Sequence, residues 1–308
     1  MKFSPKQLNE FVDIIRLNHV IYIAEIVGVD SLSPDDKKIL KKYGMSDETL
    51  TTPFTETEQA FYWGRLSQAL KHKAHKVNYH DFTEYLRRGQ YIPLSKTEES
   101  ALKYIKNNTY NHIKGLGDKI VQDVNGIVIK NDPDLRASYE EVIRSSLERG
   151  VIERNSLQSI VSEIGHRTED WSRNLGRIVD TEMQNAFQIG RAEQIKRDKG
   201  ADSLVYKDVY SGACHKCIEL YLTGGIGSQP RIFKLNNLVA NGNNYGLKQK
   251  DWKATLGPVH PYCRCNLHQL PDGYVWDEEK QMFSPPPYEP TGEKLGYKIT
   301  VGDKVIEV

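Results

Sequence analysis

All four cysteines of this 308-residue chain lie in one segment near its C-terminal end, and they constrain the fold more than any other feature. Cys214 and Cys217 form a C-x-x-C pair, and Cys263 and Cys265 follow His260 in a second short segment. Structural zinc sites take four tetrahedral ligands from two such segments, either four cysteines or three cysteines and a histidine. Residues two apart in an extended strand point to the same side, so Cys263 and Cys265 can both reach one ion. In a chain that we expect not to be secreted, this clustering favours a metal site over disulfides.

The sequence allows more than one choice of four metal ligands. The four cysteines alone complete a tetrahedral site, and His260 is the alternative for the fourth position. The cysteines could instead be separate buried thiols, which proteins tolerate well. We expect a structural Zn²⁺ site drawn from Cys214, Cys217, Cys263, Cys265 and His260. A closed site of this kind staples loops and carries out no chemistry.

The first 200 residues have the pattern of a helical protein, because cap signals recur just before segments of helical periodicity. Helix starts are predicted at Ser4-Pro5, Ser33-Pro34, Ser95 with Glu98, and Asp132-Pro133. The helix that follows Ser95 is predicted to be broken or kinked near Gly115 and Gly117.

The segment from Thr168 to Lys199 is the clearest predicted helix. At 100° per residue, one stripe carries Leu175, Ile178, Glu182, Ala186 and Ile189, and the opposite face carries Arg177, Gln184, Gln188 and Arg191. The first stripe is predicted to face the core and the second to face a partner. Glu182 interrupts the apolar stripe, so it needs a hydrogen-bond donor if it is buried, or else it reaches water.

After Gly200 the pattern changes to short β-like runs at 204–206, 231–233, 274–276 and 282–283. The sequence PPPYEP at 285–290 predicts a stiff connector, and Gly302-Asp303 predicts the turn of a β-hairpin that docks on its own chain or a neighbour. We therefore expect an α+β protein in three parts: a helical N-terminal region, residues 1–130; a small module with the metal site, residues 131–284; and the connector and hairpin, residues 285–308.

The charge balance and hydropathy exclude some classes of function. The formal net charge is +1, so any contact with nucleic acid must be local. One stretch, Gln59 to His80, lacks acidic residues, and it holds Arg65, Lys71, His72, Lys73, His75, Lys76 and His80. A solvated helix end explains it more simply than a DNA-binding surface. The three aromatic residues at its start, Phe61, Tyr62 and Trp63, are expected to anchor the helix.

No apolar run reaches the ~20 residues needed to span a bilayer, so we expect no membrane contact.

Two motifs together resemble a known family. Downstream of the C-x-x-C pair stands Gly257-Pro258-Val259-His260-Pro261-Tyr262-Cys263-Arg264-Cys265, and upstream stands a helix with Arg177-Ile178, Thr181-Glu182, Ala186 and Gly190-Arg191. Their order and spacing are similar to the HPxCRC block and the R-I-x-x-T-E-x-x-x-A-x-x-x-G-R helix of the phage head morphogenesis family, the phage Mu protein F-like minor head proteins. The resemblance covers roughly residues 140 to 270.

This resemblance implies a structural minor capsid protein of the virion rather than an enzyme. Members of the family associate with the portal vertex in low copy, and in some phages they affect DNA packaging or ejection. The implied partners are the phage portal protein, the major capsid protein and the packaged DNA, with the host cytoplasm as the place of assembly.

Two alternatives remain open: a DNA-binding protein without capsid association, and an HNH-like nuclease with a zinc knuckle. The nuclease is disfavoured because no Asp adjoins His260.

Overall fold

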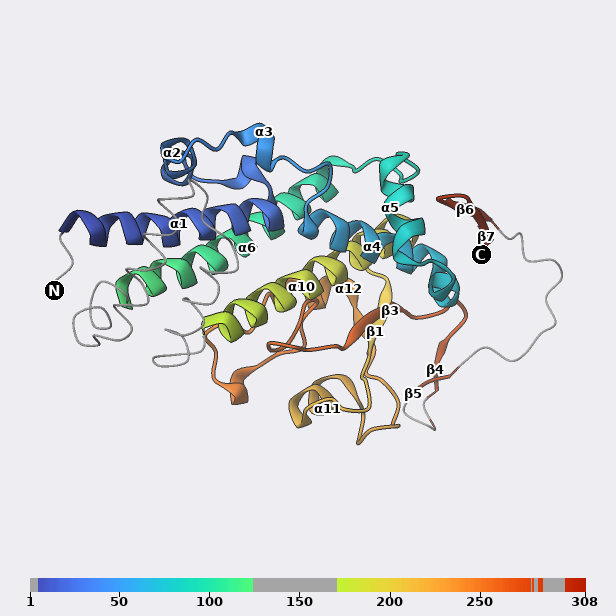
Figure 1. Ribbon diagram of the computed structural model, residues 1–308. Helices are drawn as coiled ribbons and strands as arrows, with labels where there is room; N and C mark the ends of the chain where they lie inside the picture. The colour runs from blue at the N-terminus through green and yellow to red at the C-terminus, as the bar shows by residue number, and fades with distance from the viewer. Residues whose placement is uncertain (1–4, 124–170, 278, 280–281, 285–296) are drawn as a thin grey trace. The chain divides into compact units, whose positions relative to one another are not determined.

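The computed structural model describes residues 5–123, 171–277, 279, 282–284 and 297–308 (Figure 1). The chain divides into two compact units. Unit 1 comprises Met1–Thr57 and Tyr104–Asp180, and unit 2 comprises Glu58–Lys103 and Thr181–Val308. The described residues form helices in the N-terminal half and small sheets toward the C-terminus, which confirms the predicted α+β class. The predicted helix after Asp132-Pro133, the boundary at 130 and the connector at 285–290 lie outside the described residues.

Unit 1 is helical, and the start of α2 follows its local cap signal. It holds α1 (Pro5–Val27), η1 (Val29–Ser31), α2 (Pro34–Lys42), α3 (Asp47–Leu50) and the second part of α6 (Lys96–Asp123). At α2 the predicted start is confirmed as a capping box, in which Asp36 N donates to Ser33 Oγ and Ser33 N donates to the Asp36 carboxylate, both at 3.2 Å.

Helix α6 runs unbroken through Gly115 and Gly117, so the predicted break is wrong. The physical reason lies in packing between helices. An added Cβ at Gly117 would lie 3.0 Å from Cγ of His19 on α1, so this glycine permits a close approach. Tertiary contact compensates for the weak helix propensity of glycine.

The helices of unit 2 are most of α4 (Glu56–Leu70), η2 (Lys71–Lys76), α5 (Tyr79–Arg87), the first part of α6 and the second part of α10 (Trp171–Lys199). Phe61 and Tyr62 are buried, as predicted for anchoring residues. Helices α4 and α10 approach closely at Gly64 and Gly190, where an added Cβ would meet the backbone of the other helix. Two small residues thus allow the two backbones to touch.

The sheet of unit 2 is antiparallel, in the order β2-β1-β3, with β1 at Leu204–Asp208, β2 at Phe233–Lys234 and β3 at Asn266–Gln269. The short helices α11 (His215–Tyr221), α12 (Leu235–Ala240) and η4 (Gln249–Asp251) lie between these strands in sequence. Val205 pairs with Gln269, and Lys207 pairs with Leu267. Val205, Leu267 and Ile195 of α10 are fully buried in one cluster with three of the cysteines, so the core and the candidate site are continuous.

Two hairpins complete unit 2. Strands β4 (Val275–Asp277) and β5 (Met282–Ser284) pair with each other, as do β6 (Lys298–Val301) and β7 (Lys304–Glu307). The predicted turn at Gly302-Asp303 is confirmed.

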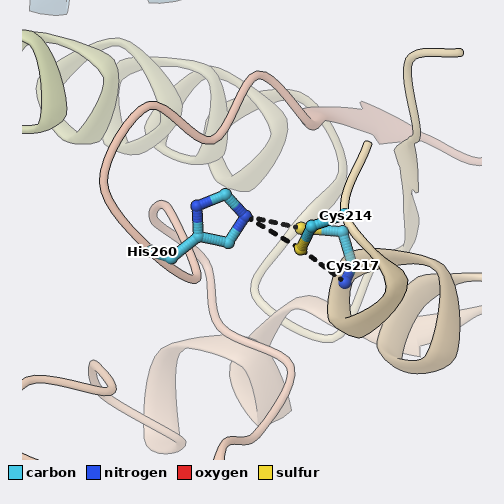
Figure 2. Close-up of side chains that lie close together, drawn as sticks. All are labelled: Cys214, Cys217 and His260. Carbon is cyan, nitrogen blue, oxygen red and sulfur yellow. Dashed lines mark hydrogen bonds between the residues drawn. The ribbon is translucent and has the colours of Figure 1, made fainter. Parts of the chain in front are cut away.

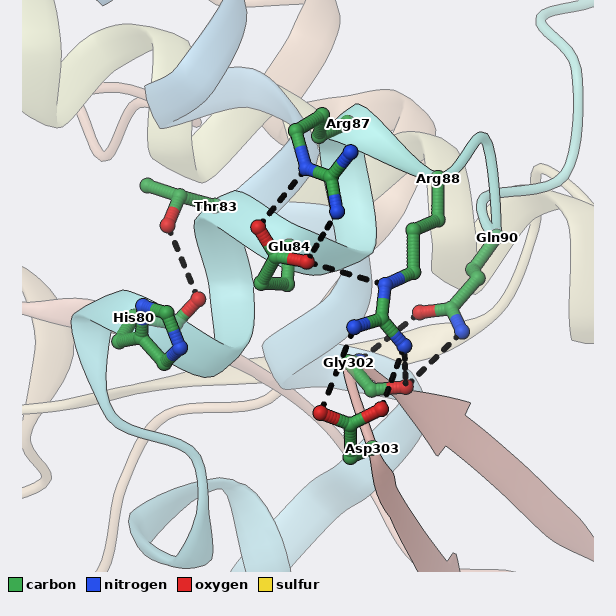
Figure 3. A network of polar contacts seen from close by, with 8 residues as sticks. All are labelled: His80, Thr83, Glu84, Arg87, Arg88, Gln90, Gly302 and Asp303. Atoms are coloured by element: carbon green, nitrogen blue, oxygen red, sulfur yellow. Dashed lines mark hydrogen bonds and ion pairs between the residues drawn. The ribbon is translucent and has the colours of Figure 1, made fainter.

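The β6–β7 hairpin docks on its own chain beside α5 (Figure 3). Arg88 pairs with Asp303 at 2.5 Å, and Gln90 exchanges two hydrogen bonds with the backbone of Gly302, at 2.8 and 3.0 Å. Lys304 pairs with Asp81 at 2.6 Å. An isolated two-stranded hairpin is marginal in water, so this docking stabilises it.

Candidate metal centre

The C-x-x-C pair is positioned by the start of α11. Cys214 is the N-cap residue of this helix, and Cys217 lies in its first turn. The backbone N–H of Cys217 donates to Cys214 Sγ at 3.4 Å, which holds the two sulfur atoms on one side of the turn. Cys214 is exposed and Cys217 is buried.

The second segment reaches the same place through the loop that leads into β3. Gly257 begins this loop against α10, where an added Cβ would clash with the side chain of Asn185. Tyr262 adopts a left-handed conformation, with φ at 61°, and Cys263 N donates to His260 O at 3.2 Å, so the chain turns sharply before Cys263. Cys265 directly precedes β3, and the pairing of β3 with β1 fixes its position.

The structure brings all five predicted ligands together in two overlapping trios that share Cys217. One trio is Cys214, Cys217 and His260, the other is Cys217, Cys263 and Cys265, and the ligand atoms of each trio lie within 4.8 Å of one another. Figure 2 shows His260 Nε2 directed at the two sulfur atoms of the first trio, 3.1 Å from Cys214 and 3.3 Å from Cys217. Cys217 Sγ lies 3.8 Å from Cys263 Sγ. These five residues can hold a metal ion.

The surroundings of His260 favour ligation through Nε2. Its Nδ1 lies 2.7 Å from the carbonyl oxygen of Pro261, and a proton on Nδ1 makes that contact a hydrogen bond. The lone pair of Nε2 then faces the sulfur atoms, in the arrangement by which histidine ligands are usually oriented. The ring of Trp252 stacks on the imidazole at 6.2 Å between centroids.

The buried thiols stabilise one negative charge among themselves. The pKa of Cys263 is held well below its ordinary value, because the Cys217 and Cys265 thiols and two backbone N–H groups donate to its sulfur. The pKa of Cys217 is raised, because its thiol donates to Cys263 and because it is buried. A second and a third thiolate need a further positive charge nearby, which a metal ion would supply if it were bound here.

Lys207 on β1 is a residue of this centre that the sequence did not single out. It is fully buried, its Nζ donates to Gly257 O at 2.6 Å, and the ammonium lies 5.3 Å from the ring centroid of Tyr221. Burial lowers its pKa to about 8, against the opposing effect of Cys263, Cys265 and Cys217. The alternation of β1 carried a signal, because Lys207 has the same parity as the core residue Val205.

Glu182 on α10 is buried, which decides between the two alternatives that the sequence left open. Its exposed fraction is 1%, and its Oε1 accepts a hydrogen bond from Tyr245 Oη at 2.9 Å. The donor that a buried carboxylate requires is therefore supplied by the loop before η4.

The predicted polar outer face of α10 is wrong at two of its four positions. Gln188 and Arg191 are buried, with exposed fractions of 0% and 7%. Arg191 donates to Leu267 O on β3 at 2.6 Å, and also to Ser67 and Gln68 on α4. The reason is tertiary, because α10 contacts both β3 and α4 through this face, and long polar side chains there satisfy backbone and amide groups.

Gln188 also holds the cysteine segment in place. Its side-chain amide donates to Cys265 O at 3.2 Å, and its Oε1 accepts from Leu267 N at 2.7 Å. These two bonds clamp the chain where the cysteine loop enters β3. The spacing of the motif placed Gln188 on the helix but did not predict this contact.

The basic stretch from Gln59 to His80, considered for DNA contact, does not form one continuous surface: its residues have different roles in the structure. Arg65 is buried and pairs with Glu98 at 3.2 Å, so it cannot meet phosphate. Residues 71–76 form η2, and Lys73 donates to Glu307 O of β7 at 2.5 Å. Part of the stretch therefore supports the hairpin.

No family model, curated protein or solved structure matches the chain. Within the described ranges, no helix is both long and apolar enough to cross a membrane.

Proposed function

We propose that this protein is a structural minor head protein of a tailed phage, and that a Zn²⁺ ion held by the cysteine-rich centre staples its C-terminal module. The observation that carries the proposal is the convergence of the two motifs on one piece of structure. Arg191 of the helix motif donates to Leu267, two residues beyond Cys265 of the cysteine motif. The residues that carry the resemblance therefore pack as one interdependent unit.

The donor set supports zinc as the metal. Thiolate and imidazole are the ligands of structural zinc sites, whereas Ca²⁺ and Mg²⁺ take oxygen ligands. Tetrahedral Zn–S bonds of ~2.3 Å place two sulfur atoms about 3.8 Å apart. The Cys217 and Cys263 sulfur atoms have this separation, 3.8 Å. Cys217, Cys263 and Cys265 would hold the ion, with Cys214 or His260 as the fourth ligand.

The proposed partner is the portal protein or another capsid component at the portal vertex. The helical portion of the chain would supply the contact surface, without Gln188 and Arg191, which are buried. Assembly would take place in the host cytoplasm and end in the virion, where packaged DNA would be a neighbour.

Co-expression with the phage portal protein tests this function. We expect the two proteins to co-purify, and imaging of assembled heads to locate the chain at the portal vertex. Cys217→Ser is the variant that separates the roles of the two parts, because it should disrupt the module while leaving the helices of unit 1 folded. A protein that stays apart from portal and procapsid but nicks DNA with Mg²⁺ would replace this proposal with the nuclease alternative.

A further inference from the structure

Lys207 is a buried cation that has no carboxylate partner among the described residues. Its exposed fraction is 0%. An ammonium that is removed from water without an opposite charge is strongly disfavoured. The hydrogen bond to Gly257 O and the Tyr221 ring offset only part of this cost.

Among the described residues, the groups that act on Lys207 electrostatically are Cys263, Cys265 and Cys217, which form the buried trio. Gly257, which accepts the hydrogen bond from Lys207, begins the loop that carries the ligands from His260 to Cys265. The ammonium is thus hydrogen-bonded to the ligand loop, and its aromatic neighbour Tyr221 belongs to the same buried cluster as the three cysteines.

We propose that Lys207 is the buried counter-cation of a metal–thiolate centre. The proposal rests on the proposed zinc site. A divalent ion with three thiolates and neutral His260 carries a net charge of −1, which Lys207 cancels. With Cys214 as the fourth ligand the net charge is −2, and Lys207 reduces it to −1. The bound metal and the lysine therefore stabilise each other, and this coupling acts equally in both directions.

This coupling predicts unequal effects of one substitution in two states. With metal bound, Lys207→Met removes a favourable charge and weakens metal retention. Without metal, fewer of the buried sulfur atoms are ionised, so the same substitution lowers the thermal midpoint less or leaves it unchanged. A purely structural lysine would show the same effect in both states.

The experiment uses the full-length protein with Zn²⁺, and the variants Lys207→Met and Lys216→Met. Lys216 is the matched control, because it is also largely buried in the same module but already pairs with Glu219 at 2.8 Å. Zinc content is measured first, followed by the rate of zinc transfer to a chromophoric chelator and the thermal midpoint with and without metal. Loss of an outer-shell partner typically weakens metal binding by about 10- to 100-fold. We expect Lys207→Met to release zinc faster by a factor in this range and Lys216→Met to release it at close to the wild-type rate.

Each outcome decides between the ideas. Zinc bound by the wild type and released equally fast by Lys207→Met overturns the counter-cation, while the zinc site stands. A midpoint lowered equally with and without metal also overturns it. A folded wild type that takes up neither Zn²⁺ nor Cd²⁺ overturns the metal centre itself, and the counter-cation with it. If Lys207→Met does not fold, Lys207→Arg keeps the charge, and its release rate should stay near that of the wild type; a rate as fast as that expected for Lys207→Met would refute the proposal.

Discussion

The crossing of α4 and α10 makes Gly190 the position where the smallest substitution should have a large effect. A Cβ added at Gly190 would lie 2.9 Å from the carbonyl carbon of Phe61 and 3.2 Å from the backbone nitrogen of Arg65, and closer still to the Phe61 oxygen. Cβ atoms essentially never approach other atoms within 3.0 Å. The obstacle is backbone, which cannot rotate away as a side chain can, so Gly190→Ala must push the two helices apart.

The magnitude follows from three contributions. Alanine is favoured over glycine inside a helix by about 1 kcal/mol, which opposes the clash. Overpacking a closely packed interface costs about 1–3 kcal/mol. Separation of the helices also strains the hydrogen bonds from Arg191 to Ser67 and Gln68, each worth about 1 kcal/mol. We expect Gly190→Ala to lower the free energy of unfolding by about 2 kcal/mol.

Denaturant unfolding of the full-length protein, monitored by circular dichroism, measures this change. Gly176→Ala is the control, because Gly176 lies on the same helix and an added Cβ there meets nothing within 4 Å. That variant should be stabilised by about 0.5–1 kcal/mol through helix propensity alone. Equal changes in the two variants would refute the packing argument. Gly64→Ala combined with Gly190→Ala should cost less than the sum of the two, because one separation relieves both clashes.

Three further predictions concern the metal, a buried carboxylate and a buried histidine. Purified protein should carry about one zinc ion per chain, and its cysteine module should lose structure on chelation or in Cys217→Ser. A folded protein in which elemental analysis detects no metal would contradict this. Glu182→Ala should cost about 1–3 kcal/mol, because it removes the hydrogen bond from Tyr245 and leaves a gap at a buried position, whereas the exposed Glu99→Ala should stay within ~0.5 kcal/mol. Equal thermal midpoints would show Glu182 to be solvated. Burial lowers the pKa of His19 to about 4 despite Asp118, so the unfolded chain, with a pKa near 6.5, binds the proton first. The stability contributed by neutral His19 is complete above pH 6.5 and is lost as the pH falls toward 4, by up to about 1.4 kcal/mol per pH unit. In His19→Leu, the free energy of unfolding should therefore fall less steeply with decreasing pH. Identical slopes of unfolding free energy against pH in the two proteins would refute this prediction.

Features that depend on a few neighbouring residues could be read from the sequence. The capping boxes that begin at Ser33 and Ser95 could be predicted, because each side chain bonds to the backbone of a residue only three positions away. The turn at Gly302-Asp303 follows from the left-handed backbone that glycine adopts there, with φ at 60°. Each half of the candidate metal centre also belongs to this class, because C-x-x-C at a helix start and two cysteines at alternate positions each place two sulfur atoms by local geometry.

Features that depend on which elements meet could not be read in this way. The helical period of α10 identified two faces, but not that Gln188 and Arg191 would be buried between β3 and α4. Gly117 looked like a helix breaker, because its contact with His19 on a distant helix is invisible to local pattern.

The cysteine spacing by itself indicated two pairs of sulfur ligands that could serve one metal ion. Only the tertiary structure decided what surrounds them. Burial is a property of the assembled elements. The interaction energy between two charges depends on how much water the neighbouring elements exclude from around them. For that reason Lys207, an ordinary lysine in the sequence, becomes in the fold a buried cation that interacts electrostatically with three buried cysteines.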